Sequence, residues 1–111
     1  MLEAAREVHE AGVEYVVVTR GREGAVAAAE ERYLRGVAPR VRAVSAVGSG
    51  DAFLAGVVLT LSRGGAIEDA LRLGIAAGTA SVLLPGTELC RRREVDILMP
   101  RVRVQPVSVA C

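Results

Sequence analysis

The sequence predicts an α/β fold in a single small unit. A helical pattern opens the chain, several β-branched or alternating segments follow it, and three further helical segments come after those. The 111 residues suffice for one domain with a modest core. Tryptophan is absent and only 3% of the residues are aromatic, so the core must be mainly aliphatic.

The first half of the chain predicts one helix and three strands. Apolar residues recur at helical spacing over residues 2–11, and Gly12 is placed to end that helix in a left-handed conformation. The β-branched run "VEYVVVT" (13–19) has no breaker and predicts a buried strand. A tight turn, "RGREG", follows. The segments 25–29 and 33–37 flank a charged tip, which predicts a hairpin.

The second half is mostly helical. "VRAVSAV" (41–47) predicts a strand that leads into a glycine-rich turn. The run 52–62 is apolar nearly all round, so we expect a helix buried on most sides. Residues 67–84 predict a second helix with acidic residues in its first turn. A short helix near 94–99 and an edge strand or extended tail at 101–107 complete the order.

Composition excludes several broad classes of protein. The net charge of +1 does not favour nucleic-acid binding. Two cysteines, Cys90 and Cys111, do not form a disulfide framework and are typical of free thiols in a reducing compartment. The N-terminus lacks the apolar core of a secretion signal, and no apolar run approaches the ~20 residues that cross a bilayer. We therefore expect a soluble cytoplasmic protein that binds neither nucleic acid nor membrane.

The stretch "VGSGDAF" is the strongest candidate for a functional site. A strand that feeds a glycine-rich turn and opens a helix offers backbone N–H groups at the positive end of the helix dipole. Gly48 and Gly50 remove side chains that would block an anion, and Ser49 can add a hydroxyl donor. A Walker A loop is excluded because the chain has no lysine, and a dinucleotide fingerprint is disfavoured by Phe53.

Asp51 admits two interpretations. It is either the N-cap of a buried helix or a carboxylate that accepts a proton from a substrate hydroxyl beside the anion site. A second glycine turn, "TRGREG", contains Thr19, Gly21 and Gly24 and is otherwise an ordinary hairpin turn. Spacing alone cannot show that the two turns meet. A purely structural α/β domain, whose glycines serve only the turns, therefore remains an alternative.

The residues then resemble a known family. "VVVTRGREGAV", "VSAVGSGDAFLAGVVLTLSRG" and "IEDALRLGIAAGTASVLLPGT" occur in the order and spacing of PfkB-type, ribokinase-like carbohydrate kinases. The sequence is most similar to the phosphosugar branch, the 1-phosphofructokinase and tagatose-6-phosphate kinase type. The resemblance covers nearly the whole chain and corresponds to the C-terminal part of the family. It implies the C-terminal portion of a ribokinase-like three-layer α/β/α fold over residues 1–111.

The resemblance also implies an activity and its residues. The reaction would be transfer of the γ-phosphoryl group of ATP to a hydroxyl of a sugar phosphate, with Mg²⁺ on the nucleotide phosphates. Asp51 matches the catalytic base. The family's anion hole matches Gly48, Ser49 and Gly50. Its segment along the ATP phosphates and ribose matches Thr19, Gly21 and Gly24. Residues 75–79 match the wall near the adenine, although they suit a core equally well.

Length qualifies these expectations. The chain matches only about the last third of the family, and the missing part would hold most of the sugar site and several strands of the sheet. We therefore expect the 111-residue chain to have no measurable sugar kinase activity on its own. The alternatives are a nucleotide-binding remnant without catalysis, which could form a homodimer, and a ribose or nucleoside kinase of the same family.

Overall fold

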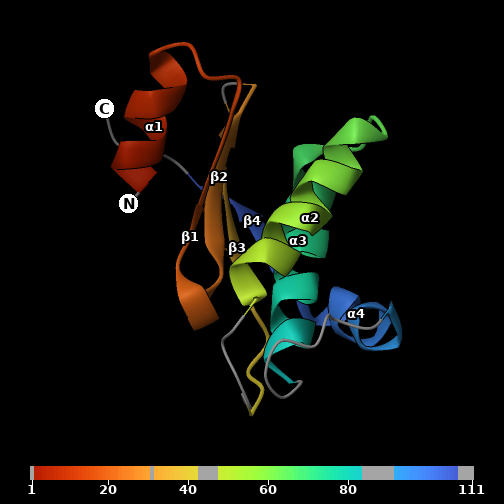
Figure 1. Ribbon diagram of the computed structural model, residues 1–111. Coiled ribbons are helices and arrows are strands. Elements are labelled where there is room, and N and C mark those ends of the chain that lie inside the picture. The colour runs from red at the N-terminus through yellow and green to blue at the C-terminus, as the bar shows by residue number, and fades with distance from the viewer. Residues whose placement is uncertain (1, 31, 43–47, 84–91, 108–111) are drawn as a thin grey trace.

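A computed structural model describes residues 2–30, 32–42, 48–83 and 92–107 of the 111-residue chain. It contains four strands, four α-helices and two short 3₁₀ turns within those residues (Figure 1). In chain order they are α1 (Leu2–Glu10), β1 (Tyr15–Thr19), η1 (Gly21–Glu23), β2 (Ala25–Ala29), β3 (Arg32–Val37), α2 (Ser49–Ser62), α3 (Ile67–Val82), α4 (Arg92–Leu98), η2 (Met99–Arg101) and β4 (Arg103–Pro106).

The strands form one antiparallel sheet in the order β1-β2-β3-β4. The predicted hairpin is confirmed, since β2 pairs with β3, and the predicted edge strand near the C-terminus is confirmed as β4, which pairs with β3. The prediction of a buried first strand was wrong. Of the strands that the structure describes, only β2 pairs with β1, and within β1 Val16 alone is buried. Tyr15 and Thr19 are exposed at the two ends of the strand.

Helices cover both faces of the sheet. Every residue of β2 is buried, and its side chains alternate between two cores as the two-residue period of a strand requires. Ala25, Ala27 and Ala29 belong to the larger core with α2 and α3, whereas Val26 and Ala28 pack in a smaller core with α1. Figure 1 shows α1 on one side of the sheet and the other helices on the opposite side. The predicted three-layer α/β/α arrangement is therefore present in the described residues.

Glycines bring α2 and α3 into close contact. A Cβ atom built at Gly56 of α2 would lie 2.9 Å from the Cα of Gly74 in α3. One built at Gly78 would lie 3.1 Å from the carbonyl oxygen of Ser49. The small residues of α3 thus serve the approach of α2, and α3 packs directly beneath the first turn of that helix.

The expectation that the helix at 52–62 is buried on most sides was wrong. Within α2 only Phe53, Gly56 and Val57 are buried. Leu54 remains 60% exposed and Val58 53% exposed, although both are large apolar residues. The helix therefore turns one apolar side to α3 and leaves another apolar side uncovered.

Other boundaries differ only slightly from those predicted. The first helix ends at Glu10, and Gly12 follows it with a φ of 116°. The helix predicted at 67–84 is α3, and the one predicted at 94–99 is α4. Val41 and Arg42, at the start of the predicted strand 41–47, lie outside any strand, and residues 43–47 lie outside the described part of the chain, as do Cys90 and Cys111.

An ion pair ties the sheet to the helical layer. The guanidinium of Arg32 at the start of β3 contacts the carboxylate of Glu68 in the first turn of α3. Hydrogen bonding from Arg32 is the main cause that lowers the pKa of Glu68, and the same contact raises the pKa of Arg32. Both side chains remain partly exposed, so the pair helps to orient α3 against β3 but adds little to the stability of the fold.

Candidate functional site

The glycine-rich turn ends where α2 begins. Gly48 occupies the N-cap position with φ 83° and ψ −3°, a left-handed conformation that favours glycine. The first hydrogen bond of the helix runs from the N–H of Ala52 to the carbonyl of Gly48, at 3.0 Å. Gly50 and Asp51 precede Ala52, so their N–H groups lie in the first turn, where a helix offers no internal acceptor. A Cβ atom built at Gly50 would meet no heavy atom within 4 Å.

Asp51 is not the N-cap of this helix. It is the third residue of α2, it is exposed, and Gly48 occupies the N-cap position. A carboxylate in the first turn is favoured by the helix dipole. The interpretation of Asp51 as the N-cap is therefore excluded by its position, and Asp51 is an exposed residue in the first turn of the helix.

The second glycine turn joins β1 to β2. Thr19 is the last residue of β1, and Gly21 opens the short 3₁₀ turn with a φ of 58° and open space around it. The N–H of Arg20 donates to the carbonyl of Gly24 across the turn, at 2.7 Å. Structurally this is a hairpin turn, as the simpler interpretation expected.

Gly24 has a packing requirement of its own. Its φ is 112°, and a Cβ atom there would collide with the carbonyl oxygen of Gly36 on β3. The residue is buried, whereas Gly21 is exposed. Of the two glycines, Gly21 is the one that a ligand could reach, because open space surrounds it. Gly24 allows the turn to pack closely against Gly36 of β3.

A single groove receives residues from both glycine turns. It has a volume of about 340 Å³ and lies between β1 and the first half of α2. Thr19 from the end of β1 and Gly50 from the first turn of α2 both line it. The structure thus brings together one residue from each turn, which spacing could not establish. The other predicted site residues, namely Gly21, Gly24, Gly48, Ser49 and Asp51, are not among those that line the groove.

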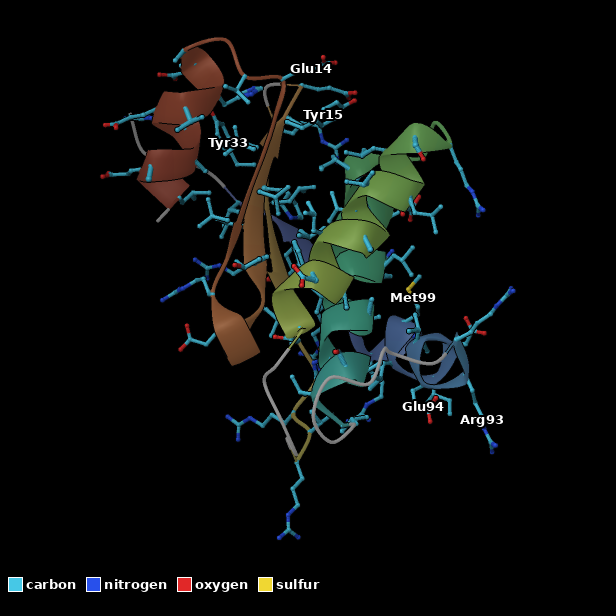
Figure 2. The ribbon with its side chains drawn as sticks, in the orientation of Figure 1. Glu14, Tyr15, Tyr33, Arg93, Glu94 and Met99 are labelled. Atoms are coloured by element: carbon cyan, nitrogen blue, oxygen red, sulfur yellow. The ribbon has the colours of Figure 1, made fainter. Side chains whose placement is uncertain are left out.

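The remaining walls of the groove were not predicted as site residues. They are the side chains of Tyr15, Val17, Phe53, Leu54 and Val57. Tyr15, labelled in Figure 2, lies between the upper end of β1 and α2. All five belong to segments that the sequence marked as core. The available signal was the absence of any charged residue over 52–62, which is unusual for a helix that keeps an exposed side.

Residues 75–79 belong to the core. Ile75, Ala76, Ala77 and Thr79 are buried, and Gly78 packs against α2. The core interpretation of this segment is therefore confirmed. Among the residues described, no group of three or more His, Cys, Asp or Glu side chains is placed to hold a metal ion. Nor do the described helices include one that is long and apolar enough to cross a membrane.

Two curated phosphofructokinases are similar in sequence to this chain. The chain is 43% identical over 96 residues to ATP-dependent 6-phosphofructokinase isozyme 2 of Mycobacterium tuberculosis, covering 86% of this chain and 28% of that protein. It is 35% identical over 108 residues to 1-phosphofructokinase of Haloferax volcanii, covering 97% of this chain and 35% of the relative. The chain thus spans about a third of the length of these curated relatives.

The fold also matches about a third of a solved kinase. The structure superposes on phosphofructokinase-2 of Escherichia coli, solved with potassium, with a TM-score of 0.86 and 33% identity. The match covers 89% of this chain and 32% of that one, and the predicted ribokinase-like α/β fold is confirmed. The pfkB family carbohydrate kinase model matches residues 1–93. On these grounds the chain belongs to the pfkB family of carbohydrate kinases.

Proposed function

We propose that this chain is the C-terminal, ATP-binding and catalytic part of a phosphosugar kinase. It would take part in transfer of the γ-phosphoryl group of ATP to a hydroxyl of a sugar phosphate. The observation that carries the proposal is the common groove of Thr19 and Gly50, which places the end of β1 beside a helix N-terminus. Family membership supplies the class of reaction.

The first turn of α2 would bind the transferring phosphoryl group. The N–H of Gly50 lies in the first turn of a helix of fourteen residues, at its positive end, where an anion is favoured. The hairpin turn, with Thr19 and the exposed Gly21, would lie along the remaining nucleotide phosphates and ribose. Gly48 shapes the turn through its left-handed conformation, and Ser49 adds a polar side chain at the helix start.

Asp51 would act as the general base. Its exposed carboxylate can accept the proton of the sugar hydroxyl as the oxygen–phosphorus bond forms. The bond between the β- and γ-phosphates breaks in the same displacement, and ADP leaves with its electron pair. The helix start would stabilise negative charge on the group in transit, so positioning and electrostatics carry most of the catalysis.

Mg²⁺ fits this site as an ion carried by the nucleotide. Proteins commonly hold Mg²⁺ through one or two carboxylates together with substrate phosphates. The described residues contain no cluster of three His, Cys, Asp or Glu side chains, so the nucleotide phosphates would supply most of the ligands. When bound, the ion would neutralise charge on the ATP phosphates.

The acceptor belongs to the class of fructose phosphates. The relatives are named for 6-phosphofructokinase and for 1-phosphofructokinase activity, so both fructose 6-phosphate and fructose 1-phosphate should be tried. A ribose or nucleoside acceptor is less favoured by these names. We also propose a cytoplasmic location, because two cysteines do not make a disulfide framework.

Titration of Mg·ATP into three forms of the chain tests the proposal. We expect the wild-type chain and Asp51→Asn to bind with affinities within about twofold, because a general base contributes to the transition state more than to binding. Asp69→Asn, which alters an exposed acid in the first turn of α3, is the matched control. Failure of the wild-type chain to bind millimolar ATP would favour a purely structural domain.

Turnover requires a longer protein. We define the hybrid kinase as the M. tuberculosis relative in which residues 1–93 of this chain replace the matching segment. Asp51→Asn should lower its kcat by about 10²- to 10⁴-fold, and Asp69→Asn should not. The free chain should give no turnover with either fructose phosphate in a coupled assay. If the kcat of the hybrid is unchanged by Asp51→Asn, Asp51 is not the general base, and the chain would bind nucleotide without this residue taking part in catalysis.

A further inference from the structure

A second cavity lies on the side of the sheet that carries α1. It has a volume of about 210 Å³. Val26 belongs to the smaller core with α1, and Arg35 is its direct partner on β3, so both side chains lie on that side of the sheet. We call this cavity the arginine pocket and define it by five of the residues that line it, namely Arg20, Glu23, Val26, Arg35 and Val37.

The helix α1 covers only part of this side of the sheet. The core beneath it includes Val16, Val26 and Ala28. Figure 1 shows α1 beside the upper part of the sheet, with the turn after β1 at the lower end. Arg35 and Val37 lie outside that core, and both are exposed. The arginine pocket is thus accessible at the end of the sheet that the described helices leave uncovered.

Arginine side chains gather at this end. Arg20 and Arg35 both line the pocket. On β4, Arg103 pairs with Val37, which lies two residues along from Arg35, so the register adds a third arginine to the same side. Within the described residues, neither Arg35 nor Arg103 takes part in an ion pair. Their charges are therefore available to an anion.

One carboxylate competes for this charge. The guanidinium of Arg20 lies 3.2 Å from the carboxylate of Glu23, which also lines the pocket. The two side chains are 46% and 64% exposed, and an ion pair that is so exposed contributes little. Glu23 would therefore weaken the binding of an anion without preventing it, by occupying N–H donors of Arg20.

We propose that the arginine pocket binds a small phosphate monoester, with the phosphoryl group between Arg20 and Arg35. A guanidinium can donate two parallel hydrogen bonds to phosphate oxygens, and two guanidinium groups balance the double charge of the monoester. Sites for drug-sized ligands have volumes of about 300–1,000 Å³, so the carbon part of this ligand must be small. Val26 and Val37 give that part apolar walls.

The arginine pocket adjoins the proposed nucleotide site without sharing its residues. Thr19 lines the groove beside α2, whereas Arg20, the next residue, lines the arginine pocket on the side of α1. The sheet separates an ester bound there from Asp51 on α2, so that ester is not the acceptor of the phosphoryl group. The inference does not require that phosphoryl transfer occur, and its tests measure binding.

Titration of glycerol 3-phosphate into the isotope-labelled free chain, followed by NMR at constant ionic strength, is the first test. We expect saturable shifts of the amide signals of Gly36 and Val37 at millimolar concentrations. Arg35→Gln should raise the Kd by at least about tenfold, because it removes one guanidinium from the phosphoryl group. Arg63→Gln, which removes the same charge from the exposed end of α2, is the matched control.

Two outcomes of this titration would overturn the proposal. One is the absence of any saturable shift at Gly36 and Val37. The other is an equal rise in Kd for Arg35→Gln and Arg63→Gln, because that result would mean that the net charge of the chain attracts the anion without a specific site.

Glu23 provides a test of opposite sign. Glu23→Gln should lower the Kd for glycerol 3-phosphate by at least about threefold, because Arg20 loses its competing partner. Asp69→Asn is the matched control, since Asp69 makes the same i,i+3 contact with Arg72 and its side chain is 65% exposed. Equal changes in the two variants, including no change in either, would contradict the placement of the phosphoryl group beside Arg20.

A last pair of measurements distinguishes this pocket from the anion site proposed at the start of α2. Gly50→Ala should leave the Kd for glycerol 3-phosphate unchanged, since Gly50 lines the other groove. Inorganic phosphate should shift the same amide signals but bind at least about threefold more weakly, because it leaves the apolar walls uncovered. Loss of binding in Gly50→Ala would place the ester at the helix start, and equal affinity for inorganic phosphate would exclude an ester as the ligand. Either result would overturn the proposal.

Discussion

Thr19 and Gly50 line the same groove although one ends a strand and the other lies in the first turn of a helix. The end of β1, where the hairpin turn begins, and the start of α2 therefore border the same groove. Since α3 packs beneath the start of α2, the position of Gly50 depends on helix packing as well as on its own loop. The stability of the fold and the shape of the site are linked at these residues.

Two glycines of the same turn should respond differently to alanine. Gly48 has a φ of 83°, so Gly48→Ala should lower the free energy of unfolding by about 1 kcal/mol. Gly50 lies within α2 and has open space around its Cα, so Gly50→Ala should leave stability unchanged or raise it by up to about 1 kcal/mol. Urea unfolding of the free chain measures both. A loss at Gly50 equal to that at Gly48 would contradict the conformations described.

Gly50→Ala should nevertheless weaken nucleotide binding. The added methyl group would fill open space beside the backbone of the first turn, and a phosphate bound at a helix start must approach that backbone closely. We expect the Kd for Mg·ATP to rise by at least about tenfold, measured by titration on the folded variant. An unchanged Kd would mean that phosphate binds elsewhere on the chain.

Gly24→Ala should destabilise the hairpin through packing. The new Cβ atom would collide with the carbonyl oxygen of Gly36, and the φ of 112° is unfavourable for alanine. The expected loss is about 2 kcal/mol or more in the free energy of unfolding. Gly21→Ala is the matched control, because the same turn leaves open space at Gly21 and only its φ of 58° opposes the change. Equal losses at the two positions would refute the packing argument.

The ion pair between Arg32 and Glu68 should contribute a pH-dependent term to stability. Hydrogen bonding from Arg32 lowers the folded-state pKa of Glu68 below its unfolded value. The contribution is therefore fully present above the ordinary pKa of glutamate, 4.5, and is lost as the pH falls through the lowered value. The difference in unfolding free energy between wild type and Glu68→Gln should accordingly shrink below pH 4.5. A difference that stays constant on acidification would exclude this role.

Much of the fold could be predicted because local signals agreed with packing. The helical spacing of α1, the turn chemistry between β2 and β3, and the acidic first turn of α3 each specify their element locally. The exposure of β1 and α2 could not be predicted in the same way. A β-branched run and an apolar helix indicate that their side chains favour burial, but they do not indicate which other segment covers those side chains.

The candidate site shows the same division between local and distant information. The glycines and Asp51 could be found from the strand-turn-helix pattern, because that pattern fixes a local conformation. The meeting of Thr19 with Gly50 depends on how β1 and α2 sit on β2 and α3, which no local signal encodes. The packing requirement at Gly24 could not be predicted for a related reason, since its neighbour Gly36 lies on another strand.

The spacing of α2 from α3 is the last relationship that a single substitution can test. A Cβ atom at Gly56 would lie 2.9 Å from the Cα and 3.0 Å from the N of Gly74, both backbone atoms that cannot rotate away. Gly56→Ala should therefore cost about 1 to 3 kcal/mol of unfolding free energy by forcing the helices apart.

The sign of that change is decisive, because alanine is otherwise the better helix residue. If the two helices had slack between them, Gly56→Ala would stabilise the chain by about 1 kcal/mol. Gly50→Ala in the same helix provides the control for this intrinsic preference, since nothing crowds it. A loss at Gly56 beside no loss at Gly50, together with weaker ATP binding by Gly56→Ala, would show that contact with α3 holds the first turn of α2 in its binding position.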